Sequence, residues 1–471
     1  MMQVSVRCCC FFFILAILFF APVQCVWADD DTAPATALAE AEKSRRFSTG
    51  TAFFDDADIS GGIYYFHRER RRENPDTGNY RTNLNHASVQ ASAAFSSGFI
   101  GDFLGFDFGI FGSADTKNRG AVDHEMSFVP WGDPWHPDWS AVDTKDGVSV
   151  YLAALKTRLG PFWGTGGYYQ PAGPGVLGVN WSILPGTYRG VNAGADVGGF
   201  SVAVAWADAY KSPWFKEMND FYKNDGTSGI PWLWSAGIRY QFETGLSLEA
   251  AYGESKGHLQ NGHVKTRYET RWGQNPVATG YQLYLMRDND GSGASENDNF
   301  DGTASHHYAF FQYEPGPWVF KLEGTYTRAP VDNEFQRGYF AYRLTDRNGS
   351  SKGAYDIWWD AHTDWNHHNE KAVFFKVDRR LDDLFPISGF SVGLGAGIGW
   401  EGEAYNTDEY LKEWAFTLDI GYVCPSGPLK DAFVKLHFTE YRNGTSLPDW
   451  EPFKNGFQSE HDVKFFAGIL F

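Results

Sequence analysis

The stretch DVKFFAGILF, residues 462–471, decides the fold because it alternates in polarity and ends on an aromatic residue. One face carries Val463, Phe465, Ala467, Ile469 and Phe471. A strand of this kind presents apolar side chains to lipid and pairs with the first strand of a closed barrel, since an open edge would leave backbone groups unpaired in hydrocarbon. We therefore predict an all-β chain that forms a transmembrane antiparallel β-barrel. Phe471 is expected to engage the barrel-assembly machinery of a Gram-negative outer membrane.

The N-terminal stretch MMQVSVRCCCFFFILAILFFAPVQCVWA, residues 1–28, predicts a secretory signal peptide. It has a positive residue, an apolar centre and a small-residue cleavage site ending at Ala28. A membrane anchor, or lipidation at Cys25, is the alternative interpretation. No apolar run of about 18 residues follows, so a membrane protein of this sequence needs strands to cross the bilayer. Residues 29–52 are acidic and alanine-rich and predict a periplasmic extension, and residues 53–471 predict the barrel domain.

Composition excludes some classes of protein. The formal net charge is -18, so the chain lacks the basic surface of a nucleic-acid-binding protein. Aromatic residues make up 17% of the chain and glycines number 52, which suits aromatic girdles at the membrane interfaces and tight turns. Cys424 is the one cysteine outside the predicted signal, so an internal disulfide is not expected.

Period-two alternation is clearest over 246–252, 318–326, 390–400 and 414–422. The apolar face of each run begins or ends with an aromatic residue, as at membrane interfaces. A soluble β-sandwich also alternates, but strands of nine to eleven residues are long for it. Removing the signal leaves 471 − 28 = 443 residues, which at about 10 residues per strand allows about 16–18 strands. A barrel of that width encloses an aqueous lumen.

The connections differ in length and character. Short ones at 427–431 and 382–389 are expected in the periplasm. Long polar ones are expected outside the cell, at 124–147, 211–231, 286–305 and 344–370.

The segment 170–190, rich in proline and glycine, is a poor strand and predicts a loop folded into the lumen. Trp181, Tyr188 and Arg189 are its candidate solute contacts, and an ordinary surface loop is the alternative.

Basic residues recur on the predicted lumen face, at Arg68, Arg239, Arg267, Arg271, Lys321, Lys376, Lys435 and Lys464. Simple solvation in a wet pore explains such charges, because a charge facing lipid at mid-depth costs about 2–4 kcal/mol. A ladder of cations that guides polar or anionic solutes is the functional interpretation. Glu249, Glu323 and Asp419 share this face, so the sequence predicts a mixed lumen rather than a strongly anion-selective one.

Tryptophans at 131, 135 and 139 cluster in VPWGDPWHPDW beside acidic and imidazole side chains. Sugar rings stack their apolar faces on aromatic rings, so Trp131, Trp135 and Trp139 are candidate sugar contacts. Membership of the aromatic girdles is the alternative for any single tryptophan.

Histidines at 306–307, 362 and 367–368 lack the regular spacing of a metal site, so we expect no metal and no cofactor. Loop histidines of this kind are expected to be solvated. No nucleophile motif stands out, and an enzyme is not expected.

Two stretches carry a resemblance to a known family. FFDDADISGGIYYFHRERRR at 53–72 resembles the first strand of the OprD family of outer-membrane porins, and SILPGTYRG at 182–190 resembles its constriction-loop motif. Within the family the chain is most similar to the chitoporins of enterobacteria, on GGIYYFHRER (61–70), YRTNLNHAS (80–88), SPWFKEMNDFYKND (212–225), YDIWWD (355–360) and VKLHFTEYRN (434–443).

The resemblance implies 18 strands, an inward third loop and passive uptake of chitooligosaccharides, which are N-acetylglucosamine oligomers. The wider family carries basic amino acids and carboxylates past arginines, for which Arg68, Arg189, Arg239 and Arg267 are the candidates here. An amino-acid or carboxylate channel, a general diffusion porin and a barrel-embedded hydrolase remain alternative interpretations.

Overall fold

The computed structural model describes residues 52–471 apart from 75–76, 118–145, 180–185, 214, 224, 289–298, 334–335, 337, 346–350, 362–363, 386, 406 and 446–457. The described part begins with one short helix, α2 (Ala52–Asp55), and is otherwise built of strands and their connections. Within the described ranges, no helix has the length and apolar character needed to cross a membrane.

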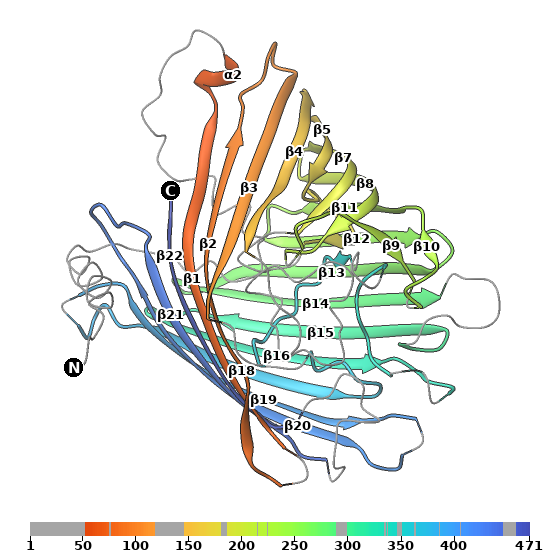
Figure 1. Cartoon of the computed structure of the whole chain (residues 1–471), viewed down its shortest axis with the longest axis vertical. Helices are drawn as coiled ribbons and strands as arrows, with labels where there is room; N and C mark the ends of the chain where they lie inside the picture. The colour runs from red at the N-terminus through yellow and green to blue at the C-terminus, as the bar shows by residue number, and fades with distance from the viewer. Residues whose placement is uncertain are drawn as a thin grey trace, which may run out of the picture.

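Eighteen antiparallel strands pair in sequence order and close into one barrel (Figure 1). They are β1 (Asp58–Glu73), β2 (Tyr80–Ser96), β3 (Leu104–Lys117), β4 (Gly147–Leu159), β5 (Phe162–Tyr169), β7 (Thr187–Val197), β8 (Phe200–Lys211), β11 (Leu233–Gln241), β12 (Leu246–Ser255), β13 (Leu259–Trp272), β14 (Asn275–Asp288), β15 (Thr303–Tyr313), β16 (Trp318–Arg328), β18 (Lys371–Arg380), β19 (Phe390–Gly402), β20 (Leu411–Val423), β21 (Phe433–Asn443) and β22 (Glu460–Leu470). Four short strands lie in the connections, namely β6 (Leu177–Gly178), β9 (Asn219–Tyr222), β10 (Gly229–Ile230) and β17 (Lys352–Gly353). The predicted fold class is confirmed.

The last strand closes the barrel against the first. β22 pairs with β1 in a continuous antiparallel register from Gly62↔Leu470 to Arg72↔Glu460, and the two lie side by side in Figure 1. The terminal residue continues the ladder, because Phe471 N donates to Gly61 O at 3.0 Å and Gly61 N donates to Phe471 O at 2.8 Å. Closure leaves neither edge strand open, as a barrel in hydrocarbon requires.

The two faces of the wall differ as the alternation predicts. On β12, Leu248 and Tyr252 are 40% and 41% exposed, whereas the intervening Glu249 is 8% exposed. The exposed face is apolar and therefore faces lipid, and the polar face is covered from within. On this strand the lumen side is thus polar and is covered by other parts of the chain.

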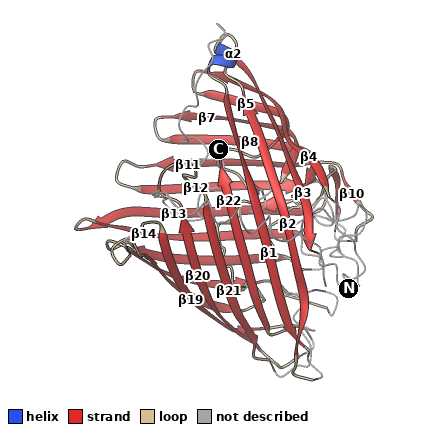
Figure 2. Cartoon of the chain, turned by 60° about the vertical axis from the view of Figure 1, so that its left-hand side comes forward, coloured by secondary structure: helices blue, strands red, loops and turns tan. Residues whose placement is uncertain are grey.

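Short turns gather at one end of the barrel, as at 160–161, 198–199 and 273–274. Helix α2 lies at this end (Figure 2), where Gly98 N of the turn after β2 donates to Phe53 O at 2.9 Å. The predicted periplasmic connections at 382–389 and 427–431 join β18 to β19 and β20 to β21, so they fall at the same end. The long connections fall at the opposite end, which in such barrels faces outward from the cell.

Candidate functional site

One connection, residues 170–186 between β5 and β7, lies against the inner wall, and we call it the first inward loop. Val176 N donates to Ser235 Oγ at 2.8 Å on β11. The backbone of Pro174 lies so close to Gly237 that a Cβ there would stand 2.6 Å from it, so glycine is what allows this approach. The prediction of an inward-folded loop is confirmed for its described residues.

A second connection also enters the lumen, and we call residues 329–370 the second inward loop. Lys265 Nζ of β13 donates to Asp356 Oδ2 at 2.6 Å. The hydroxyl of Tyr342 and Nδ1 of His263 on β13 are hydrogen-bonded at 2.9 Å.

The connection that contains 344–370 starts and ends at the outward-facing end of the barrel, as expected, but its described residues fold into the lumen instead of projecting into the medium. The loop folds inward because it carries many apolar side chains. Buried members of this loop, Phe340, Tyr342, Ile357, Trp359 and Trp365, join one core with wall residues, and such side chains leave water when a wall is near.

The two inward loops are joined to each other. β6 of the first pairs antiparallel with β17 of the second, through Gly178↔Lys352 and Leu177↔Gly353. Ala354 N also donates to Val176 O at 2.9 Å. The constriction is therefore one composite element, and neither loop narrows the lumen alone.

Several aromatic rings of this element form packing contacts. Trp359 stacks on Phe374 of β18 at a centroid distance of 5.2 Å with an interplanar angle of 10°. Tyr284 of β14 lies 4.9 Å from both Tyr342 and Tyr355. Tyr355 is partly buried and the other rings are buried, so they hold the second inward loop in place rather than offering a free face to a solute.

On one side of the lumen the wall holds a continuous set of ion pairs centred on two carboxylates. Asp360 of the second inward loop accepts from Lys464 Nζ at 2.5 Å and lies 3.4 Å from His437 Nε2. Asp419 of β20 lies 3.1 Å from Lys435 Nζ and 2.9 Å from His437 Nδ1. This set, Asp360, Asp419, Lys435, His437 and Lys464, ties the loop to β20, β21 and β22.

The pKa of Asp360 reflects this arrangement. Burial raises it, but the positive charges of Lys464, His437 and Lys435 outweigh the burial and leave the pKa below its usual range. Asp360 is therefore a carboxylate at any pH near neutrality, and its attraction to the wall persists.

Five of the eight predicted lumen cations lie on the inner wall with an acidic partner each, whereas the described contact of Arg271 is a hydrogen bond to Gln274 O. Arg68 Nη2 lies 2.6 Å from Asp462, Arg239 Nη2 2.5 Å from Glu249, Arg267 Nε 2.8 Å from Glu269, Lys321 Nζ 3.5 Å from Glu323, and Lys376 Nζ 3.3 Å from Asp378. The mixed lumen expected from the alternation is what the structure contains. A carboxylate opposite each cation means that this set is not a ladder of uncompensated positive charge.

The remaining predicted solute contacts are Tyr188, Arg189 and four tryptophans. Tyr188 is buried beneath the first inward loop, and its hydroxyl donates to Gly178 O at 3.1 Å. The side chain of Arg189, the next residue on β7, is 44% exposed and pairs with Asp208 at 2.7 Å. The role of Arg189 as a solute contact stays a prediction. The predicted sugar contacts at 131, 135, 139 and 181 lie outside the described residues.

Sequence reasoning missed His437, Lys265 and the two loop carboxylates. His437 stands two positions after Lys435 on the same alternating face, and Lys265 stands two before Arg267. The two-residue period therefore predicts that both side chains face the lumen. The roles of Asp356 and Asp360 carry no such signal, because they depend on the loop turning inward.

Comparison with known proteins defines the class. Residues 51–452 match the family described as outer membrane porin, OprD family. The chitoporin of Escherichia coli (strain K12) is 37% identical over 433 residues, which cover 88% of this chain and 91% of that protein. The chain belongs to the OprD family of outer membrane porins. It is a multi-pass β-barrel of the Gram-negative outer membrane.

Solved structures share the fold at low sequence identity. Pseudomonas aeruginosa OpdK, solved with vanillate, has a TM-score of 0.70 at 17% identity and covers 89% of this chain and 99% of that chain. Acinetobacter baumannii OccAB1 has a TM-score of 0.72 at 16% identity, and the match covers 92% of this chain and 99% of that chain. At this identity the likeness establishes the barrel architecture and nothing about the solute.

Proposed function

We propose that this porin admits chitooligosaccharides to the periplasm by passive diffusion. The observation that carries the proposal is the 37% identity to a protein named chitoporin across nine-tenths of both chains. The match covers 88% of this chain, so it includes most of the barrel wall and its connections. No energy source is required, because a concentration gradient drives the flow.

The charge balance of the inner wall supports a neutral solute. Five of the wall cations, at 68, 239, 267, 321 and 376, each pair with a carboxylate. A carboxylate solute would compete with these built-in partners for each cation. A neutral sugar bears hydroxyl and amide groups that hydrogen-bond to both signs of charge without displacing either. The mixed wall therefore favours an uncharged, polar oligomer.

Aromatic stacking would supply the remaining contacts. We assign this role to Trp131, Trp135 and Trp139 in the connection after β3 and to Trp181 in the first inward loop. Each is flanked by polar or small residues in the sequence, so a ring can lie open to a sugar face. Binding at each contact has to be weak, because tight binding would stop release into the periplasm.

Three further assignments complete the proposal. Residues 1–28 serve as a removable export signal, and residues 29–52 form a periplasmic extension. Phe471 is the residue that the barrel-assembly machinery engages.

Single-channel current in a planar bilayer tests the solute. Chitohexaose is added first, and maltohexaose serves as a neutral oligomer of similar length. Saturable block by chitohexaose alone supports the proposal. Absence of block by either sugar, together with block by benzoate or arginine, would replace it with the amino-acid and carboxylate alternative. Passage of all four without saturation would indicate a general diffusion porin.

A further inference from the structure

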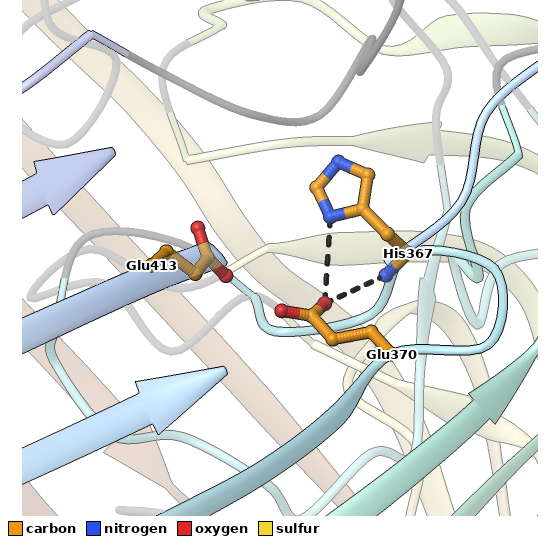
Figure 3. A group of neighbouring side chains, drawn as sticks. All are labelled: His367, Glu370 and Glu413. Atoms are coloured by element: carbon orange, nitrogen blue, oxygen red, sulfur yellow. Dashed lines mark hydrogen bonds and ion pairs between the residues drawn. The ribbon is translucent and has the colours of Figure 1, made fainter. Parts of the chain in front are cut away.

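Three side chains that commonly bind metals meet where the second inward loop returns to the wall (Figure 3). His367 and Glu370 come from the end of the loop, and Glu413 comes from β20. All three are buried, and one nitrogen or oxygen atom from each lies within 4.8 Å of the others. The sequence did not suggest this group, and the expectation that such loop histidines are solvated is wrong for His367.

A tight turn brings the two loop residues together. Glu370 N donates to His367 O at 3.1 Å, and the intervening Asn369 has a left-handed φ of 59°. The Glu370 carboxylate accepts a hydrogen bond from His367 N at 3.0 Å and lies 3.4 Å from His367 Nδ1 (Figure 3). The imidazole and the carboxylate are therefore on one side of the turn and point toward β20.

The wall leaves room for the group at Gly399 of β19. A Cβ built at that position would stand 2.4 Å from Glu370 Oε1 and 3.2 Å from Glu413 Cγ. Any side chain at this position would displace the carboxylate of Glu370. On the far side, the hydroxyl of Tyr441 donates to Glu413 Oε2 at 2.5 Å and orients that carboxylate.

One oxygen of Glu370, Oε1, is buried and receives no N–H or hydroxyl donor from the described residues other than the facing carboxyl group. It points toward the carboxylate of Glu413 (Figure 3), with which it can hydrogen-bond only if one of the two carries a proton. An ionised carboxylate accepts hydrogen bonds and donates none. Two buried carboxylates that face one another repel unless a cation or a proton lies between them.

We propose that His367, Glu370 and Glu413 bind one divalent transition-metal ion of the zinc type. One imidazole nitrogen with two carboxylate oxygens is a donor set suited to zinc, whereas calcium and magnesium prefer oxygen donors alone. Tetrahedral donors about 2.1 Å from zinc lie about 3.4 Å apart. The donors need to approach by no more than about 1.4 Å, and side-chain rotations provide that movement. The two positive charges balance the two carboxylates.

The ion would join the end of the second inward loop to β20 across the lumen wall. Because Glu370 immediately precedes β18, the link would fix the point at which the loop leaves the wall. The predicted consequence is greater thermal stability of the folded barrel in the presence of zinc.

Zinc binding to the full-length barrel in detergent tests the proposal, after chelation and removal of the chelator. Calorimetry should detect one high-affinity Zn²⁺ per chain, and the thermal-unfolding midpoint should rise with Zn²⁺. Glu370→Gln should weaken this binding more than about tenfold, since even residues that only orient ligands contribute that much. Glu403→Gln is the matched control, because Glu403 is a nearby carboxylate that accepts from Asn369 Nδ2. Equal affinity in the wild type and Glu370→Gln would overturn the proposal.

A spectroscopic measurement on the wild type keeps the test independent of how the variant folds. Co²⁺ at the site should give the intense visible bands of a four-coordinate ion, and Zn²⁺ should abolish them. Absence of these bands would overturn the proposal. A second result would also overturn the proposal, namely a Glu370→Gln variant that unfolds at a higher temperature than the wild type while neither protein responds to metal. That result would mean that Glu370 and Glu413 share a proton in the wild type.

Discussion

Replacing Asp360 by asparagine removes the charge through which the second inward loop is held to β21 and β22. The substitution preserves shape and removes the attraction to Lys464 Nζ at 2.5 Å and to His437 Nε2 at 3.4 Å. The side chain of Lys464 is 7% exposed and that of Asp360 is 25% exposed. Lys464 would therefore keep its charge in a poorly solvated position with one fewer carboxylate beside it.

The magnitude follows from these contacts. A hydrogen bond to a charged group contributes about 1.5–3 kcal/mol, and removing one partner of a buried pair costs about 3–5 kcal/mol. Because Asp360 is partly exposed, the free energy that holds the loop in the lumen is expected to fall by about 2–4 kcal/mol. At 1.4 kcal/mol per tenfold, the equilibrium between loop in and loop out shifts about 30- to 700-fold toward the open lumen.

Single-channel recording measures this shift as bursts of higher conductance in Asp360→Asn. Asp364→Asn is the matched control, because it removes the same charge from an exposed position on the same loop. Asp356→Asn, which releases Lys265, should add to the effect. If Asp360→Asn and the double variant Asp356→Asn/Asp360→Asn both conduct like the wild type, the loop is not held by these charges and the reasoning is refuted.

The pH dependence has a defined sign. A carboxylate whose pKa is lowered in the folded protein stabilises the fold above its unfolded pKa, near 3.8, and loses that contribution as the pH falls through the lower, folded value. Between pH 7 and pH 5 Asp360 therefore stays charged. The conductance difference between the wild type and Asp360→Asn should be the same at both pH values, and its disappearance at pH 5 would contradict the lowered pKa.

Three other perturbations follow. Trp135→Ala and Trp181→Ala should each weaken block of the current by chitohexaose, and unchanged block in both would reject sugar stacking at these positions. Deletion of 173–180 removes β6 and the contact of Val176 with Ser235, so mean conductance should rise; an unaltered value would mean that this loop does not narrow the pore. Removal of Phe471 takes two backbone hydrogen bonds from the closing strands, about 1–3 kcal/mol together. The amount of heat-modifiable, folded barrel should fall, and wild-type yield would argue against its role in closure.

Much of the wall follows from period-two alternation. Residues such as Arg68, Arg239 and Lys376 were placed on the lumen side because a strand turns alternate side chains to opposite faces, and the structure agrees. Arg189 shows the limit of that rule. It belongs to a segment where the alternation is broken by glycine and by a register shift after it, so its face could not be counted from neighbouring strands.

The site itself depended on contacts between distant parts of the chain. Residues 344–370 look like an exposed polar connection, yet their aromatic side chains pack inside the barrel with Tyr284 and Phe374. Glu370 and Glu413 are 43 positions apart in the sequence, and nothing local links them. Only the direction in which the loop turns brings the two carboxylates to one place.

The sequence by itself determined the barrel, its closing strand, the lumen face of its regular strands and the inward course of the first loop. These properties are local, since they follow from the two-residue period, from proline and glycine that forbid a strand, and from the need to satisfy every backbone group in lipid. The tertiary structure alone decided that a second loop enters the lumen, that β6 and β17 join the two loops, and that five of the predicted lumen cations each pair with a carboxylate. Those outcomes depend on burial and charge pairing between residues far apart in the chain, which no local pattern records.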